Sequence, residues 1–299
     1  MQPSSESPRV PPALALGVAV AAVSTSAILV EWSDAPSLVK ALYRVLFTTL
    51  LVAPAAMVRN PGAMRSLPRR DLLGAGVAGV ALAVHFGAWF ESLNWTSVAA
   101  SVTLVQAQPV FVAVGAVFLL DERFTRKMAL GIAVALGGMV LMSAGDLVGT
   151  PAAGATRPLY GDALAVLGAF AAAVYVLAGR SLRRRISLLP YVTVVYAACT
   201  VVLFGLVLAG GYPLFDYPPE EWALFLGMAL GPGIFGHTVV NWALAHVESS
   251  VVSVSLLGEP VVSTLLAVAL LGEVPGALTV LGGGVVLAGI YVTAEDREA

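Results

Sequence analysis

Runs of apolar residues, each about long enough to cross a membrane, follow one another along almost the whole chain. We assign ten of them, separated by short polar segments, with predicted bounds of 13–31, 37–58, 72–93, 98–119, 127–145, 160–180, 188–210, 221–244, 250–271 and 276–294. Roughly 20 apolar residues in a helix span the hydrocarbon core of a bilayer. A soluble helical protein would keep polar residues on every exposed helix face. The pattern therefore predicts an all-α, polytopic membrane protein with ten transmembrane helices.

The stretch from Ser97 to Met142 occurs twice, and adding 151 to its landmark positions gives the same residue types in the same order. These landmarks are Pro109, Leu119, Glu122, Gly131 and Gly138 in the first copy, and Pro260, Leu270, Glu273, Gly282 and Gly289 in the second. The chain thus divides into a first five-helix repeat, 13–145, a linker, 146–159, and a second repeat, 160–294. Because five is an odd number, the second repeat is expected to enter the membrane in the opposite direction, as an inverted repeat around a central cavity.

Composition and charge agree with this class of protein. Hydrophobic residues make up 59% of the chain and charged residues 11%, against about 25% charged in soluble domains, and the mean hydropathy is +0.90. The expected partner is the lipid bilayer, and no nucleic acid is expected, since the net charge is -2 and the basic residues occupy only short loops. The single cysteine, Cys199, can form no internal disulfide.

The distribution of arginine and lysine predicts the orientation. With the amino terminus inside, the cytoplasmic segments hold 13 of the 16 cations, including four arginines between Arg180 and Arg185. The opposite side keeps only Arg157, whereas Lys40 and Arg44 lie within the second helix. The positive-inside rule therefore places both termini in the cytoplasm and the protein in the cytoplasmic membrane. We expect the first apolar run to span the membrane and not to be a cleaved signal peptide, because its counterpart from Asp162 to Arg180 is internal.

Several predicted helices carry side chains that are unfavourable in lipid, where an ionisable group costs about 2.5–3.5 kcal/mol on insertion scales. Such residues are expected to line a hydrated cavity between the two halves. The candidate cavity and substrate-binding residues are Tyr43, Arg44, His85, Trp89, Gln106, Gln108, His237, Asn241 and Trp242. For Arg44, two interpretations are equally favoured: binding of an anionic solute, and pairing with Glu31 or Glu91. For Gln108, a residue of this kind in a membrane helix more often joins helices through hydrogen bonds than binds a ligand.

Glu259 is the strongest candidate for function, because it combines an acid with a neighbouring helix-perturbing proline deep in a predicted helix. Together with His237 it is a candidate for coupling transport to protons, since both groups exchange protons. Pro109 and Pro260 are expected to interrupt helical hydrogen bonding. Gly131, Gly138, Gly282 and Gly289 are expected to allow close packing of the last helix of each repeat.

These residues also carry a family resemblance. The chain resembles the EamA-type permeases of the drug/metabolite transporter superfamily from Leu14 to Thr293, and the matching features lie in both repeats in the same order. They include Tyr43-Arg44, His85-Phe86, Gln108-Pro109, Asp121-Glu122-Arg123, Tyr175, Gly179-Arg180, Gly236-His237, Asn241, Glu259-Pro260 and Gly272-Glu273. The resemblance implies ten helices in two inverted repeats, with the fifth and tenth towards the periphery. It also implies transport of small metabolites, amino acids or drugs by alternating access.

The driving force is expected to be a gradient. With only Lys40 and Lys127 present, the chain holds no GxxxxGK[ST] loop for nucleotide binding. A secondary-active or facilitative transporter of small solutes, with a proton as a second candidate partner, is the preferred function, and a flippase for a lipid-linked substrate is the alternative. An enzyme is not expected, since the sequence has no HExxH or GxSxG motif, and neither a metal nor a cofactor is predicted. The oligomeric state stays open.

Overall fold

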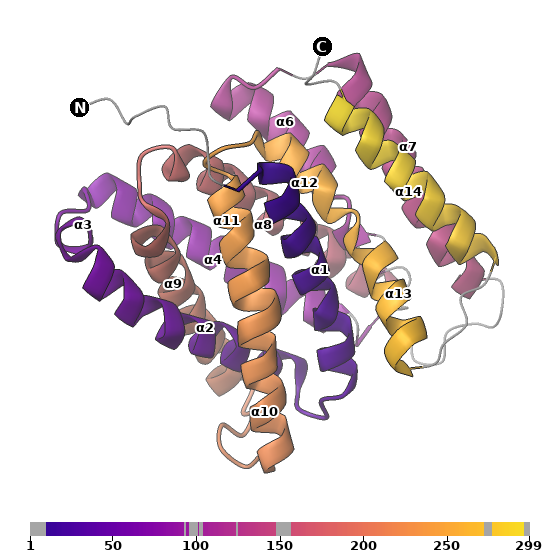
Figure 1. The fold of residues 1–299 in the computed structure, drawn as a ribbon. Helices are drawn as coiled ribbons and strands as arrows, with labels where there is room; N and C mark the ends of the chain where they lie inside the picture. The colour runs from indigo at the N-terminus through magenta and orange to yellow at the C-terminus, as the bar shows by residue number, and fades with distance from the viewer. Residues whose placement is uncertain are drawn as a thin grey trace.

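The structure, a computed structural model, describes residues 10–92, 94–95, 101, 104–123, 125–147, 157–271 and 277–295. Every element in these ranges is a helix (Figure 1). The first half contains α1 (Pro12–Glu31), α2 (Ser37–Arg59), α3 (Pro61–Arg65), α4 (Arg69–Ser92), α6 (Gln108–Leu120) and α7 (Arg126–Leu147). The second half contains α8 (Pro158–Arg183), α9 (Leu188–Ala209), α10 (Pro219–Met228), the π-helix η1 (Ala229–Thr238), α11 (Val239–Ala243), α12 (Ser249–Leu256), α13 (Glu259–Leu271) and α14 (Ala277–Glu295).

Seven helices in the described ranges are long and apolar enough to cross a membrane. They are Pro12–Val30, Ser37–Arg59, Arg69–Ser92, Leu159–Arg183, Leu188–Ala209, Pro219–Ala243 and Ser249–Leu270. Two further apolar helices, Gln108–Leu120 and Val280–Thr293, are shorter than a full span. The all-helical membrane architecture is therefore confirmed, whereas the predicted number of ten transmembrane helices is not. The fourth expected helix, 98–119, falls partly outside the described residues, and its described part is interrupted.

The interruptions lie at equivalent places in the two halves. A turn at Gln106–Ala107 precedes α6, and a turn at Leu257–Gly258 precedes α13. In both cases a proline, Pro109 or Pro260, is the second residue of the new helix, where its missing N–H is not needed for a helical hydrogen bond. Each new helix thus begins with a polar residue in the middle of an apolar stretch: Gln108 in α6 and Glu259 in α13.

Helices from the two halves pack against one another in matching pairs. α4 of the first half packs on α8 of the second, and η1 and α11 of the second half, which continue α10, pack on α1 of the first. α2 contacts its equivalent α9, whereas α6, the part after the interruption in the first half, contacts α12, the part before the interruption in the second half. Small residues allow the closest approaches: a Cβ atom placed on Gly79 of α4 would lie 2.3 Å from the carbonyl oxygen of Val195 in α9. The core is consequently shared between the halves.

α7 and α14 lie side by side at one edge of the bundle (Figure 1). Their contact is made by the glycines that the sequence singled out. A Cβ atom on Gly138 would lie 2.6 Å from the backbone nitrogen of Val286 and 2.7 Å from the carbonyl oxygen of Gly282. One on Gly289 would lie 2.6 Å from the carbonyl oxygen of Gly131. We call this contact the glycine seam, and no side chain larger than hydrogen fits at these positions.

Candidate functional site

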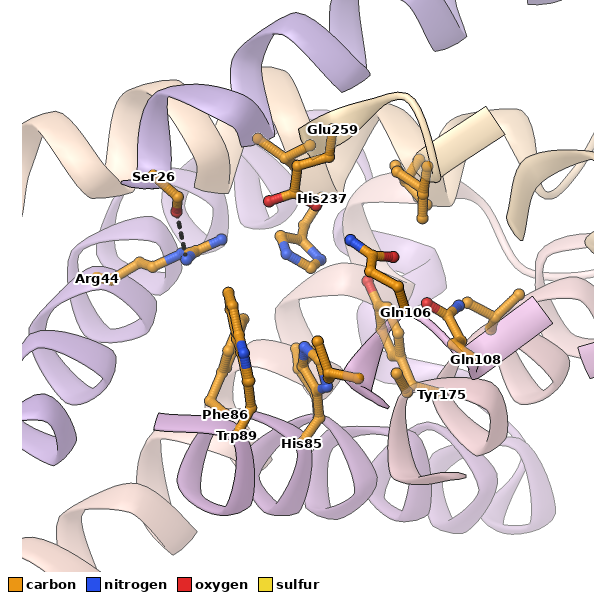
Figure 2. A pocket seen from close by; sticks show the side chains of 17 residues that line it. Ser26, Arg44, His85, Phe86, Trp89, Gln106, Gln108, Tyr175, His237 and Glu259 are labelled. Carbon is orange, nitrogen blue, oxygen red and sulfur yellow. Dashed lines mark hydrogen bonds between the residues drawn. The ribbon is translucent and has the colours of Figure 1, made fainter. Parts of the chain in front are cut away.

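A cavity of about 70 Å³ lies between the two halves, at the depth of the helix interruptions. Its walls come from α1, α2, α4, the turn before α6, α6, α8, η1, α11, α12 and α13, and Figure 2 shows the side chains that line it. The polar lining residues are Ser26, Arg44, His85, Trp89, Gln106, Gln108, Tyr175, His237 and Glu259. Seven of the predicted site residues therefore share one cavity: Arg44, His85, Trp89, Gln106, Gln108, His237 and Glu259.

Arg44 carries a permanent charge on the cavity wall. Its side chain comes from α2, only 3% of the residue is exposed, and its Nη1 donates a hydrogen bond of 2.9 Å to Oγ of Ser26 in α1 (Figure 2). The guanidinium carbon lies 4.8 Å from the ring centre of Phe86, within the range of a cation–π contact. Among the side chains that the structure describes, no carboxylate lies within 4 Å of this guanidinium.

The sequence analysis named Glu31 and Glu91 as possible partners of Arg44. Glu91 accepts a hydrogen bond of 2.8 Å from Nε1 of Trp95, at the end of α4, and does not pair with Arg44. The side chain of Glu31 lies outside the described residues. Lys40, one turn before Arg44 in α2, instead donates to the carbonyl oxygens of Ser33, at 2.6 Å, and Val30, at 3.1 Å.

Aromatic side chains of α4 form one wall of the cavity. The rings of His85 and Trp89 stack, with centroids 5.8 Å apart and planes 22° apart, and the ring of Phe86 meets that of His237 edge to face at 5.5 Å. Nδ1 of His85 lies 3.0 Å from the carbonyl oxygen of Gly168, which fixes the ring against α8.

Two polar atoms of the cavity lining are buried and have no hydrogen-bond partner among the described residues: Nε1 of Trp89, in α4, and Nδ1 of His237, in η1. A buried polar atom without a partner costs about 1–3 kcal/mol. Both residues line the cavity, so a solute within it can supply the missing partners. The indole N–H can only donate, which makes it selective for a hydrogen-bond acceptor.

The helix interruptions bring amide and carboxyl groups to the cavity. Gln106 and Gln108 flank the first interruption, and Glu259 follows the second. Gln108 and Glu259 are equivalent positions, because adding 151 to 108 gives 259. The backbone of Glu259 is held against α1, since its carbonyl oxygen accepts a hydrogen bond of 3.1 Å from Oγ of Ser24. Equivalent positions of the two halves thus line one cavity with different chemistry.

Three predicted site residues do not line this cavity. The ring of Tyr43 stacks on Phe225, 4.9 Å away, and its hydroxyl donates to the carbonyl oxygen of Leu214. Asn241 is fully buried, and its Nδ2 donates to the hydroxyl of Tyr175 and to the carbonyl oxygen of His237. Trp242 packs on His246, with ring centroids 4.3 Å apart, in a separate outer groove beside α1.

Helix geometry explains why Tyr43 and Trp242 lie away from the cavity. Tyr43 immediately precedes Arg44, and Trp242 immediately follows Asn241. Adjacent side chains of an α-helix point about 100° apart around its axis, so Tyr43 points away from the side that Arg44 faces, and Trp242 away from the side that Asn241 faces. The sequence analysis in turn did not place Ser26, Phe86 and Tyr175 in the cavity that they line, nor its aliphatic lining residues. Ser26, a polar residue inside an apolar run, was a usable signal for this position, whereas Phe86 and Tyr175 are indistinguishable in sequence from packing residues.

The combined groups favour binding of a small solute over chemical conversion. Arg44 and Trp89 offer hydrogen-bond donors, Glu259 offers an acceptor or an acid, and the rings offer an apolar surface. Within the described ranges, no three His, Cys, Asp or Glu side chains come together as they would around a metal ion.

Comparison with known proteins gives the family. The EamA-like transporter family matches residues 12–144 and 159–294. The chain belongs to this family. An uncharacterized transporter from Archaeoglobus fulgidus is 30% identical to this EamA-family protein over 244 residues, which cover 78% of this chain and 79% of the relative. A probable terminal-alkyne amino-acid exporter from Streptantibioticus cattleyicolor is 28% identical over 239 residues, covering 79% of this chain and 75% of that protein.

Other comparisons agree with membrane transport. The uncharacterized inner membrane transporter YhbE of Escherichia coli is 26% identical over 245 residues, which cover 81% of this chain and 75% of that protein. A crystal structure superposes with a TM-score of 0.80 at 20% identity, covering 96% of this chain and 97% of the other, which shows the same fold. The EamA-family chain is therefore an integral membrane transporter with two repeats, and a transporter is not an enzyme.

Proposed function

We propose that this EamA-family protein carries small metabolites, such as amino acids or drug-like solutes, by secondary-active or facilitative transport with alternating access. The observation that carries the proposal is the position of Arg44. A buried guanidinium on the wall of a cavity, bonded to a neutral hydroxyl and facing further donors, is suited to bind an anionic group of a solute. A carboxylate on Arg44, with the apolar part of the solute on the rings of Trp89 and Phe86, gives a consistent mode of binding.

The description of one relative supports amino acids as the class of solute. The protein from Streptantibioticus cattleyicolor is described as a probable terminal-alkyne amino-acid exporter, and an amino acid carries the carboxylate that Arg44 would bind. Glu259 and His237 line the same cavity and are the proposed proton-coupling pair. Protonation of Glu259 would remove the second charge of the cavity, so that binding of solute and proton would be linked.

The size of the cavity supports alternating access. Pockets for drug-sized ligands measure about 300–1,000 Å³, whereas the cavity here measures about 70 Å³. This conformation is therefore closed around the site, and a solute can reach it only if helices move apart. Two inverted five-helix repeats, with both termini in the cytoplasm, would allow the cavity to open to one side at a time.

The decisive experiment is a binding screen followed by transport. Purified protein is screened by thermal shift against amino acids and common metabolites, and each solute that raises Tm is then tested for uptake by proteoliposomes. We expect solutes with a carboxylate to bind, and we expect Arg44→Gln to weaken their binding at least about tenfold, as for the loss of a charge-assisted hydrogen bond. Arg59→Gln, at the exposed end of the same helix, is the matched control.

Two results would contradict the proposal. Binding only of solutes without a negative group, with an affinity that Arg44→Gln leaves unchanged, would remove the role of Arg44. Movement of a lipid-linked substrate, with no uptake of any water-soluble solute, would favour the flippase alternative.

A further inference from the structure

One end of the bundle is closed by the carboxylate of Glu122, which follows α6. Its Oε1 accepts a hydrogen bond of 3.0 Å from Nε of Arg180 in α8 and one of 3.1 Å from the backbone nitrogen of Ser249. Its Oε2 accepts from Oγ of Ser249 at 2.8 Å. Nη1 of Arg180 also donates to the carbonyl oxygen of Leu244, at 3.0 Å. The Glu122 side chain therefore joins the end of α8 to the beginning of α12, and Arg180 adds a bond to Leu244, the residue that follows α11.

These residues lie directly beyond the cavity on the same helix faces. Arg180 follows the cavity-lining Val176 by four residues, and Ser249 precedes the cavity-lining Leu256 by seven, which keeps each pair on one face of its helix. The side chains of Arg180 and Glu122 are 14% and 7% exposed, respectively. The cluster, which we call the Glu122 tie, thus lies between the cavity and this end of the bundle.

A second carboxylate, Glu221 at the beginning of α10, makes a comparable connection elsewhere. Its Oε2 accepts a hydrogen bond of 2.5 Å from Oγ of Ser33, and its Oε1 accepts one of 2.6 Å from the backbone nitrogen of Asp34. Ser33 and Asp34 form the connection between α1 and α2 in the other half. Glu221 is only 5% exposed. We call this cluster the Glu221 tie.

The two ties lie at opposite ends of the molecule. Glu221 lies in the first turn of the continuous helical run α10–η1–α11, and Leu244 directly follows the end of this run. At a rise of about 1.5 Å per residue, the two residues are about 35 Å apart along the helix axis. The cavity lies between them, since His237 of η1 lines it. In the orientation that the arginine distribution predicts, the Glu122 tie faces the cytoplasm and the Glu221 tie faces outward.

The Glu221 tie also has an equivalent in the other half. Asp71, at the start of α4, accepts hydrogen bonds of 3.0 and 2.8 Å from Nε and Nη2 of Arg185. Arg185 is the position equivalent to Asp34, because adding 151 to 34 gives 185, and Asp71 lies one residue from the position equivalent to Glu221, because adding 151 to 71 gives 222. The Arg185 side chain is 47% exposed, so this pair is screened by solvent and is worth little. The buried Glu221 tie is the stronger of the two.

We propose that Glu122 and Glu221 are the gating residues of the transporter: each closes one end of the cavity, and the cavity opens at an end only when the carboxylate there releases its donors. The inference rests on the proposed alternating-access transport. Both ties are formed at the same time in this structure, which accounts for a cavity too small for a solute. Loss of one tie shifts the population of conformations towards opening at that end, without a change in the residues that bind the solute.

The test measures access to the cavity from each side. In a Cys199→Ala background, which removes the single native cysteine, Val176→Cys places one thiol on the cavity wall. A membrane-impermeant maleimide is then applied to intact cells and, separately, to inverted vesicles. We expect Glu122→Gln to raise the labelling rate from one side about tenfold and Glu221→Gln to raise it as much from the other, as for the loss of one charge-assisted hydrogen bond.

Controls come from exposed neighbours. Arg123→Gln and Glu220→Gln change a charge next to each tie without touching it, and both are expected to leave labelling unchanged. Ser249→Ala and Ser33→Ala each remove one donor from a tie and are expected to give smaller increases on the same sides. These two variants decide the question if a glutamine variant does not fold, as judged by size-exclusion chromatography.

Unchanged labelling in the glutamine and alanine variants, or increases from one and the same side for both ties, would overturn the proposal. Labelling needs no solute. The gating inference can therefore fail while transport is demonstrated, and it can hold when a screen finds no substrate.

Discussion

The guanidinium of Arg44 donates a hydrogen bond of 2.9 Å to the hydroxyl of Ser26, so a permanent charge in the middle of the bundle is held by a neutral group. Arg180, by contrast, donates to the carboxylate of Glu122 at 3.0 Å. Replacement of Arg44 therefore leaves a neutral hydroxyl without its donor, whereas replacement of Arg180 leaves a carboxylate without its charged donor.

Arg44→Gln is expected to leave the Tm of the solute-free protein unchanged or to raise it, because the substitution removes a desolvated charge that has no carboxylate partner in the described structure. Arg180→Gln is expected to lower stability by about 2 kcal/mol, because Glu122 then loses a charged donor. Thermal unfolding of both variants in the same detergent measures the difference. A larger loss of stability for Arg44→Gln than for Arg180→Gln would show that Arg44 has a structural role.

Trp89→Ala is expected to weaken solute binding at least about tenfold, because it removes both a ring of the cavity wall and the unpaired indole N–H. Trp242→Ala is the matched control, since the side chain of Trp242 lies in the outer groove beside α1, and it is expected to leave binding unchanged. Isothermal titration of a solute found in the screen compares the two. Equal losses in both variants would place the binding site elsewhere.

Glu259→Gln is expected to make solute uptake independent of an imposed pH gradient, because the amide keeps the shape of the side chain but exchanges no proton. Uptake by proteoliposomes, with and without the gradient, measures this effect. Glu220→Gln, an exposed change far from the cavity, should retain the wild-type response. A pH-gradient response that persists in Glu259→Gln excludes this residue as the coupling group.

Gly138→Ala is expected to destabilise the protein by about 1–3 kcal/mol, since its Cβ would lie 2.6 Å from backbone atoms of α14 and would force the helices apart. Gly137→Ala, the preceding residue, meets no atom within 4 Å. It is expected to raise stability by about 0.5–1 kcal/mol, because alanine favours the helix. Opposite shifts in Tm for these adjacent residues would establish the glycine seam, and equal shifts would argue against it.

The sequence located the apolar segments of the second half, because these depend on local pattern, but it did not predict the interruption at Leu257–Gly258 within the expected helix 250–271. Apolar runs fix where a helix lies in the chain, and glycines repeated at a seven-residue spacing lie on one face. Long-range repetition also placed Gln108 and Glu259 at equivalent points, and the structure brings both to one cavity.

The remaining features depend on contacts between distant parts of the chain. Nothing in the local pattern shows that Trp89 faces the cavity while Trp242 faces an outer groove, because both lie in equally apolar surroundings. The π-helix η1 was not predicted; it contains Pro232, whose missing N–H favours a departure from regular helical bonding. The hydrogen bond from Ser249 to Glu122 joins residues 127 positions apart, and nothing in the local pattern around Glu122 shows that it contacts a helix of the other half.

The glycine seam has a consequence for motion. Where α7 and α14 meet, backbone lies against backbone, and a slide of one helix along the other would bring methyl groups against carbonyl oxygens that now face only hydrogen atoms. Small rotations about the contact keep the glycines opposed and meet no such obstacle. This edge of the molecule is therefore suited to serve as a pivot, and the displacement that admits a solute is expected to be largest among the helices farthest from it.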